Sequence, residues 1–197
     1  MAEQGGRRLA GRRLTAPKAP AIIEAQMRLI PLVVLAAIAL PAPAAAGELF
    51  GGIYAHDIDS PLSASGVEPG ADIQLGWRGG RIAGTPLQPY IFGAVNTDGE
   101  TNYAAVGLSA KFGKKVYVRP GVGLALHTGS AKNFQDPSNG KIEFGSRILF
   151  EPELGLGVQL NDRLSIEASW MHMSHAQIFG RQNPGIDNIG MRVNLAL

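Results

Sequence analysis

From residue 47 onward, apolar residues alternate with polar or small ones, and turn-forming residues interrupt the alternation at intervals. Side chains in a β-strand point to opposite faces with a period of two, so this pattern predicts strands with one apolar face. The 3.6-residue period of an amphipathic helix is not evident in this part of the sequence. Eight strands are predicted, at residues 49–57, 70–79, 87–96, 101–112, 115–127, 144–160, 163–174 and 186–197.

The connections between these strands differ in length. Tight turns are predicted at Asp98-Gly99, Gly113-Lys114 and Asn161-Asp162, and long polar connections at 58–69, 128–143 and 175–185. If both chain ends lie in the periplasm, the connections after the first, third, fifth and seventh strands are extracellular, and three of these four are the long ones. The connection 80–86, on the periplasmic side, is of intermediate length. Short turns at one end and long loops at the other are typical of bacterial outer-membrane barrels. The predicted fold class is therefore all-β, an eight-stranded antiparallel transmembrane β-barrel.

Alternation alone does not say which face of the sheet points outward. A soluble periplasmic β-sandwich or a lipocalin-like barrel has the same alternation, with its apolar face inside. In the segment 153–160, leucine and valine alternate with glycine, glutamate and glutamine. Small residues on the second face suit the narrow interior of an eight-stranded barrel. Together with the loop lengths and an export signal, this favours the membrane barrel.

The export signal lies in the first 46 residues. Arg28 precedes an apolar run, Leu29–Leu40, and Ala44–Ala46 provide the small residues of a cleavage site before Gly47. The run is shorter than the ~20 residues of a transmembrane helix, so an uncleaved anchor is the weaker alternative. We expect residues 1–46 to be a leader with a signal peptide, with Met27 as an alternative start, and residues 47–197 to form the barrel.

Charge and composition exclude several classes of function. The whole chain has a net charge of +2, but six of its Lys and Arg residues and only two of its acidic residues lie in the leader. The remainder is slightly acidic, which gives no support for a nucleic-acid partner. The chain has no cysteine, and therefore no disulfide and no thiolate metal site.

The last two predicted strands place three reactive side chains on an apolar face. His172 and Ser174 continue the face of Ile166 and Trp170, and Asp187 shares its face with Ile189 and the alternate apolar residues that follow it. Polar groups on an apolar surface are costly unless they have partners. If Trp170 lies opposite Ile189, the antiparallel register places His172 opposite Asp187. An acid, a base and a hydroxyl in this order match the logic of serine hydrolases.

Other interpretations compete for these and neighbouring residues. A His and a Ser beside Trp170 are also typical of a membrane interface. Glu151 and Glu153 could form a carboxylate pair for acid–base chemistry, but their position beside glycines favours polar side chains inside the barrel. Glu167 and Arg192 predict an ion pair there, and His56 and His127, with no acid near them in the pattern, are interpreted as loop or interface residues.

The segment around the three reactive residues resembles the lipid A deacylase (PagL) family. The resemblance is carried by His172-Met173-Ser174-His175-Ala176, by Asn183-Pro184-Gly185-Ile186-Asp187, and by FEPELGLGVQLNDRLSIEASW at 150–170. It implies an eight-stranded barrel in the bacterial outer membrane that hydrolyses the ester-linked acyl chain at the 3-position of lipid A. It also implies that Ser174 is the nucleophile, His172 the general base and Asp187 the orienting acid, with no metal and no cofactor.

The sequence departs from the family pattern at three places. Well-known members carry glutamate at the position of Asp187, and their preceding loop is one residue shorter. The residue after the nucleophile is often an asparagine assigned to the oxyanion hole, and here His175 is the candidate for that role. The chain ends in Leu197, where many barrels end in an aromatic residue.

The expected function is therefore that of an outer-membrane esterase, with lipid A or lipopolysaccharide as substrate and membrane lipid as surroundings. A non-enzymatic barrel with a structural or adhesive role is the main alternative, and the outward His, Ser and Asp residues argue against it. A phospholipase with its catalytic residues in the barrel lumen is a third alternative, and it would place those polar residues on the opposite face of the strands. The sequence leaves a homodimer open.

Overall fold

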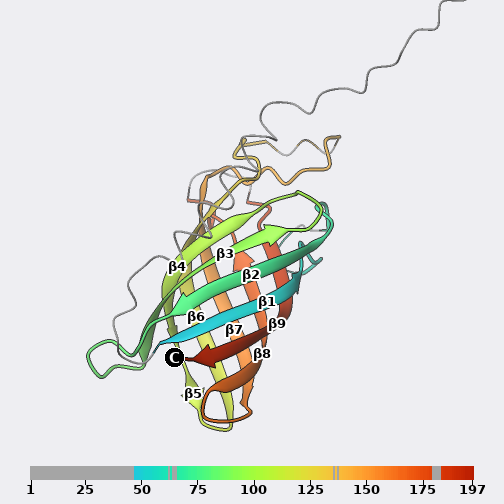
Figure 1. Cartoon of the computed structure of the whole chain (residues 1–197). Coiled ribbons are helices and arrows are strands. Elements are labelled where there is room, and N and C mark those ends of the chain that lie inside the picture. Colours follow the sequence, from blue (N-terminus) through green and yellow to red (C-terminus); the bar gives the residue numbers. More distant parts are fainter. Residues whose placement is uncertain (1–46, 62, 64–65, 135, 137, 179–182) are drawn as a thin grey trace, which may run out of the picture.

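The structure, a computed structural model, describes residues 47–197 except 62, 64–65, 135, 137 and 179–182. The predicted leader at residues 1–46, with the alternative start at Met27, lies outside the described residues. One antiparallel sheet closes on itself as a barrel (Figure 1). None of the described residues forms a helix long and apolar enough to cross a membrane.

The barrel wall consists of antiparallel strands in chain order. They are β1 (Glu48–Ala55), β2 (Ala71–Arg78), β3 (Leu87–Asn96), β4 (Tyr103–Ala110), β5 (Phe112–Gly113), β6 (Val116–His127), β7 (Ile148–Gln159), β8 (Leu164–Met173) and β9 (Ile186–Ala196). Pairing of β1 with β9 and of β4 with β6 completes the ring. β4 and β5 pair with β6 in one continuous register, so they are two parts of a single barrel strand. The barrel thus has eight strands, as predicted.

The interruption between β4 and β5 has a local cause. Ser109 lies opposite Gly121 and Phe112 lies opposite Val118, so the break falls opposite Arg119 and Pro120. Proline has no N–H to donate to the ladder, and sheets accommodate it at edges, bulges or breaks.

The outer wall is apolar and the interior is polar. Val122, Leu124 and Leu126 on β6 are 59%, 48% and 61% exposed, whereas Glu151 and Glu153 on β7 are buried. A soluble barrel would have the reverse arrangement, because its apolar side chains must leave water. This polarity is that of a membrane-spanning barrel and argues against the soluble alternative.

Buried charges inside the barrel form a paired network. Its members are Arg78, Arg119, Arg192, Glu48, Glu153 and Glu167. Arg192 lies 2.8 Å from Glu153 and 2.6 Å from Glu167, which confirms the predicted ion pair with Glu167. Three cations balance three anions, as buried charges require.

Glycines on the inner face make room for this network. A Cβ at position 155 would lie 2.3 Å from Oε1 of Glu167, and one at position 157 would lie 2.1 Å from the ring of Tyr117. Gly155 and Gly157, which have no side chain, therefore allow large polar side chains to fill a narrow interior, as the alternation on β7 predicts.

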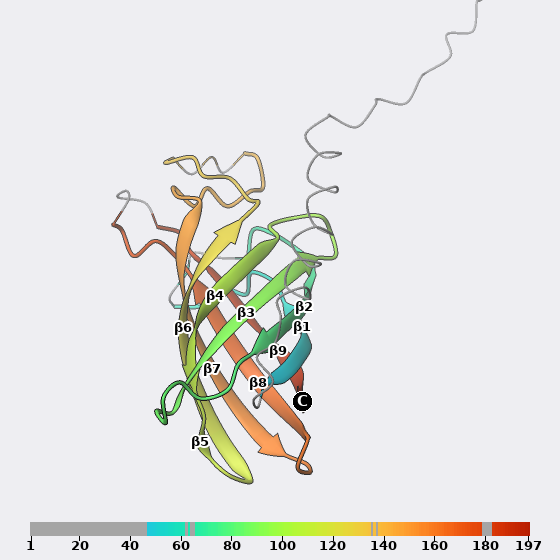
Figure 2. The same cartoon turned by 60° about the vertical axis from the view of Figure 1, so that its left-hand side comes forward.

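Long connections gather at one end of the barrel. The described parts of 128–147 and 174–185 lie at this end, and the β7–β8 turn lies at the other (Figures 1 and 2). We expect this loop-rich end to face outward from the cell.

Strand β7 begins at Ile148, four residues later than the sequence predicts. Ile142 and Phe144 are instead buried at the end of the barrel, where the Phe144 ring lies 4.4 Å from the ring of His127. Gly145 then takes a positive φ of 76°, which the extended geometry of a strand does not allow. Phe144, the first residue of the predicted strand, thus helps to close the barrel end instead of extending its wall.

Candidate active site

The β8–β9 register brings the three reactive residues together. Trp170 lies opposite Ile189 and His172 lies opposite Asp187, as predicted. His172 Nδ1 lies 3.1 Å from Oδ1 of Asp187, and His172 Nε2 lies 2.9 Å from Oγ of Ser174. The imidazole therefore bridges the carboxylate and the hydroxyl in the order that a serine hydrolase uses.

Ser174 is held by backbone pairing beyond the end of β8. Its N–H donates to the carbonyl of Phe150 at 3.1 Å, and its own carbonyl accepts from the Phe150 N–H at 2.7 Å. This bridge keeps residue 174 extended, so its side chain leaves the sheet on the same face as that of His172.

The Asp187 carboxylate is fully buried and accepts hydrogen bonds on both oxygens. Oδ1 accepts from Trp170 Nε1 at 2.9 Å, in addition to its contact with His172. Oδ2 accepts from the hydroxyls of Ser60 at 2.5 Å and Ser63 at 2.6 Å. These distances are in the range of charge-assisted hydrogen bonds.

Ser60 and Ser63 are site residues that the sequence pattern does not identify. They lie on the connection between β1 and β2, 127 and 124 positions before Asp187 in the chain. Closure of the barrel by β1 and β9 brings that connection beside Asp187. The ring topology is the only signal for this contact, and it does not specify which residues of a polar loop reach the carboxylate.

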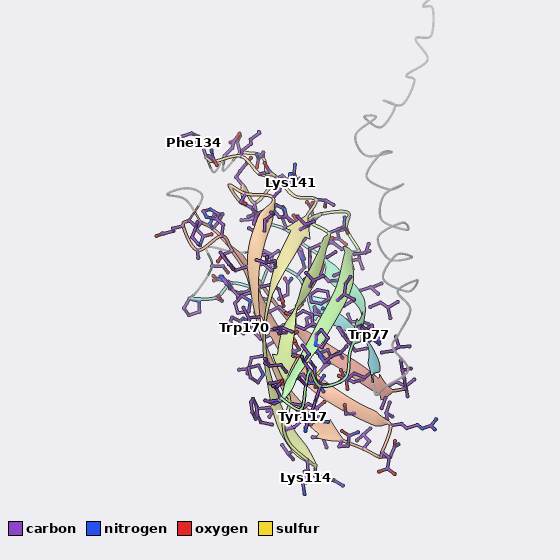
Figure 3. The ribbon with its side chains drawn as sticks, turned by 90° about the vertical axis from the view of Figure 1, so that its left-hand side faces the viewer. Trp77, Lys114, Tyr117, Phe134, Lys141 and Trp170 are labelled. Atoms are coloured by element: carbon purple, nitrogen blue, oxygen red, sulfur yellow. The ribbon has the colours of Figure 1, made fainter. Side chains whose placement is uncertain are left out.

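The site opens through the barrel wall and not into its interior. The His172 side chain is 13% exposed, and its ring stacks on Trp170 with centroids 6.3 Å apart. Trp170 lies on the wall between Phe134 and Lys141 at the loop end and Lys114 at the opposite end (Figure 3). The neighbouring Ile189 is 49% exposed, so the residues beside the imidazole form part of the apolar outer surface.

Gly185 allows the chain to enter β9 close to the imidazole. Its φ is +64°, and a Cβ there would lie 3.0 Å from Cε1 of His172. A larger residue would be strained in its backbone and would press on the His172 ring.

His175 lies outside the three-residue cluster. Its backbone N–H donates to Oδ1 of Asn183 at 2.9 Å. Its imidazole is fully buried, with Nε2 3.1 Å from the position of a Cβ at Gly145. Its role in an oxyanion hole stays a prediction.

His56 and His127 are more deeply placed than the sequence suggests. His56 is buried between Asp72 and Glu68, at 2.9 and 3.4 Å. These acids are 16 and 12 positions away, beyond the reach of a local pattern. His127 Nε2 contacts the carbonyl of Ser146 at 2.6 Å, and neither ring contributes to the candidate active site.

A separate polar cleft lies at the loop end. Its volume is about 270 Å³, and it is lined by Glu68, Gly99, Glu100, Thr101, Thr128, Gly129, Ser130, Lys141 and Arg147. None of the three reactive residues lines this cleft. Within the described part of the chain, no group of three or more His, Asp or Glu side chains is placed to hold a metal ion.

Comparisons with known proteins identify a family and a fold for this chain. The family model described as Lipid A 3-O-deacylase (PagL) matches residues 70–196. The crystal structure of the outer membrane enzyme PagL has 17% sequence identity and a TM-score of 0.52, covering 75% of this chain and 98% of that one. The N-terminal β-barrel domain of Pseudomonas aeruginosa OprF has 12% identity and a TM-score of 0.52, covering 77% and 97%. At such identities, similarity to solved structures shows the fold alone, and no curated protein matches the sequence.

Proposed function

This chain belongs to the lipid A 3-O-deacylase (PagL) family, and we propose that Ser174, His172 and Asp187 hydrolyse the ester-linked acyl chain at the 3-position of lipid A. Family membership and fold identify an outer-membrane lipid A deacylase. The observation that carries the finer proposal is the position of His172, in contact with both Ser174 and Asp187 on the lipid-facing wall.

The proposed first step forms an acyl-enzyme. With its own proton on Nδ1, facing Asp187, His172 accepts the Ser174 hydroxyl proton on Nε2. The Ser174 oxygen bonds to the ester carbonyl carbon, and the bond from that carbon to the sugar oxygen breaks. His172 then gives the proton to the departing sugar oxygen, which leaves as a hydroxyl group.

Water completes the reaction in the second step. His172 takes a proton from the water while the water oxygen attacks the acyl carbonyl carbon. The bond to Ser174 breaks, the proton returns to the serine oxygen, and a free fatty acid is released. Asp187 stays ionised throughout, because it orients the imidazole and stabilises the imidazolium ion.

The negative charge on the carbonyl oxygen in each step requires hydrogen-bond donors. His175 is the proposed contributor on the grounds of its place after the nucleophile. Its N–H donates a hydrogen bond to Oδ1 of Asn183, so the substrate oxygen would have to replace the Asn183 oxygen.

The apolar surroundings fit a lipid substrate. Trp170 and Ile189 lie on the outer wall beside His172, where an acyl chain would remain in contact with apolar side chains. A substrate in the outer leaflet would reach Ser174 by lateral movement, without leaving the membrane. In this proposal the leader at residues 1–46 directs export and is removed.

A serine-directed alkyl phosphonate tests the nucleophile. We expect Ser174 Oγ to attack the phosphorus atom, displace its leaving group and form a stable adduct, which peptide mass spectrometry would locate at Ser174. Ser174→Ala should remain unlabelled, and His172→Ala should label far more slowly. Labelling of a folded Ser174→Ala variant at the wild-type rate would refute the assignment.

A further inference from the structure

We propose that Ser60 and Ser63, on the connection between β1 and β2, are positioning residues for this reaction, and that their hydroxyls fix the Asp187 carboxylate toward His172. The inference rests on the proposed function and adds to it a loop that lies far from Ser174 in the sequence.

Hydrogen bonds on both oxygens fix the orientation of the Asp187 carboxylate. Both hydroxyls donate to Oδ2, whereas His172 and Trp170 contact Oδ1. Rotation of the carboxylate about its Cβ–Cγ bond would break bonds on both oxygens at once. The loop hydroxyls therefore hold the carboxylate plane in the orientation that points one oxygen at the imidazole.

The loop hydroxyls also reduce the cost of burying the charge of Asp187. The Asp187 side chain is fully buried, and an ionised carboxylate in such a place needs donors for its lone pairs. Ser60 and Ser63 supply two of the four contacts described here. Without them, His172 and Trp170 would be the remaining side-chain partners of this carboxylate among the described residues.

The β1–β2 connection is anchored beside Asp187 where it leaves β1. The Ile58 N–H donates to the Asp187 carbonyl at 2.8 Å, and the Asp57 N–H donates to Asn188 Oδ1 at 2.9 Å. These two bonds continue the alignment of β1 with β9 past the end of the strand. Ser60 is therefore two residues away from a backbone contact with the residue whose side chain it binds.

The other end of the connection is tied to the same base. Asp57 Oδ2 accepts from the backbone N–H groups of Val67 and Glu68, at 2.7 and 2.9 Å. His56 bridges Glu68 and Asp72 beneath them. Asp57 itself has a φ of +49°, which turns the chain out of β1 toward the carboxylate. The two described ends of the connection are therefore bonded to one another, which helps to hold the hydroxyls of Ser60 and Ser63 in a defined place, as a positioning element must.

Loss of the hydroxyls has a predictable chemical effect. A carboxylate with fewer donors is freer to turn away from Nδ1 of His172, so the imidazole is less often oriented to accept the Ser174 proton. The rate of the chemical step should therefore fall, while substrate binding, in which the two loop hydroxyls take no part, should not change.

The experiment compares purified full-length barrels carrying Ser60→Ala, Ser63→Ala or both, with lipid A as substrate. The matched control is Ser138→Ala, which removes an exposed hydroxyl that donates a hydrogen bond to Asp136 on the β6–β7 connection. We expect kcat to fall about tenfold for each hydroxyl, at unchanged KM, as the loss of one hydrogen bond to a charged group would produce. Ser63→Thr should restore most of the rate because it keeps a hydroxyl.

The outcomes separate this inference from the proposed function. Wild-type kcat in folded Ser60→Ala and Ser63→Ala would overturn the positioning role, while Ser174→Ala would still be inactive. A loss confined to KM would also overturn it, by assigning the loop to substrate binding. If the double variant does not fold, the single variants and Ser63→Thr decide. Inactivity of the wild-type barrel itself would instead count against the proposed function.

Discussion

The Asp187 side chain connects most of the site at the scale of single residues. Its backbone position is set by β9 pairing, and its two oxygens meet groups from β8 and from the β1–β2 connection. An aspartate has one methylene fewer than a glutamate, so its reach depends strongly on backbone placement. Here the directly opposed position across from His172 brings Oδ1 within 3.1 Å of Nδ1.

Replacement of this carboxylate by an amide tests its role with little change in shape. In Asp187→Asn we expect kcat to fall by a factor on the order of 10³–10⁴, because the amide can favour the wrong imidazole tautomer and cannot stabilise the imidazolium ion. Steady-state hydrolysis of lipid A by the purified barrel measures this. The control is Asp59→Asn, which changes an exposed acid on the β1–β2 connection. An Asp187→Asn variant with a kcat close to that of wild type would contradict the proposed role of the acid.

Sequence patterns predict some of these residues and not others, for a physical reason. His172, Ser174 and Asp187 follow from strand parity and from the register of one hairpin, both of which are local. Ser60 and Ser63 depend on closure between the first and last strands and on loop conformation. A turn such as that at Asp57, with its positive φ, leaves no periodic trace in the sequence.

At the scale of elements, the base of the β1–β2 connection contains a buried ionic cluster. Burial lowers the pKa of His56, but its hydrogen bonds to Asp72 and Glu68 outweigh this effect and raise the pKa to about 9. Burial raises the pKa of Glu68, and its hydrogen bonds to His56 and Thr101 bring it below the ordinary value. Both groups are therefore charged in the folded barrel at neutral pH.

This cluster predicts how the stability of the barrel changes with pH. A histidine whose pKa is higher in the folded state stabilises that state fully below about pH 6.5, its unfolded value. The contribution declines as the pH rises and is lost once the pH passes about 9. We expect the thermal unfolding temperature of wild type to fall between pH 6 and pH 10, and His56→Gln to show a much smaller fall. Equal slopes in the two proteins would show that His56 does not carry this dependence.

Element boundaries show where periodicity is sufficient and where it is not. Strands β2, β3, β6, β8 and β9 begin and end within one residue of the prediction. The start of β7 differs, because Ile142 and Phe144 are apolar residues that cover the barrel end and do not continue the wall. A strand pattern cannot distinguish these two uses of apolar side chains.

At the scale of the whole molecule, the distribution of polarity explains why the site lies on the outside. The interior is filled by the paired arginines and glutamates and by Tyr54, Tyr90 and Tyr117, so it offers little room for a lipid. The apolar exterior is in contact with the acyl chains of the membrane. In the proposed function, reactive groups that face this exterior near the loop end meet the ester bonds of the leaflet directly.

The most direct test of this account is mass spectrometry of lipid A from bacteria that produce the wild-type protein. Ser174→Ala and His172→Ala, present in the outer membrane in equal amounts, are the controls. The account predicts that wild-type cells lose one ester-linked acyl chain from the 3-position of lipid A, and that both variants leave lipid A intact. Unchanged lipid A in cells with a correctly inserted wild-type barrel, or loss of the chain in the Ser174→Ala cells, would contradict it.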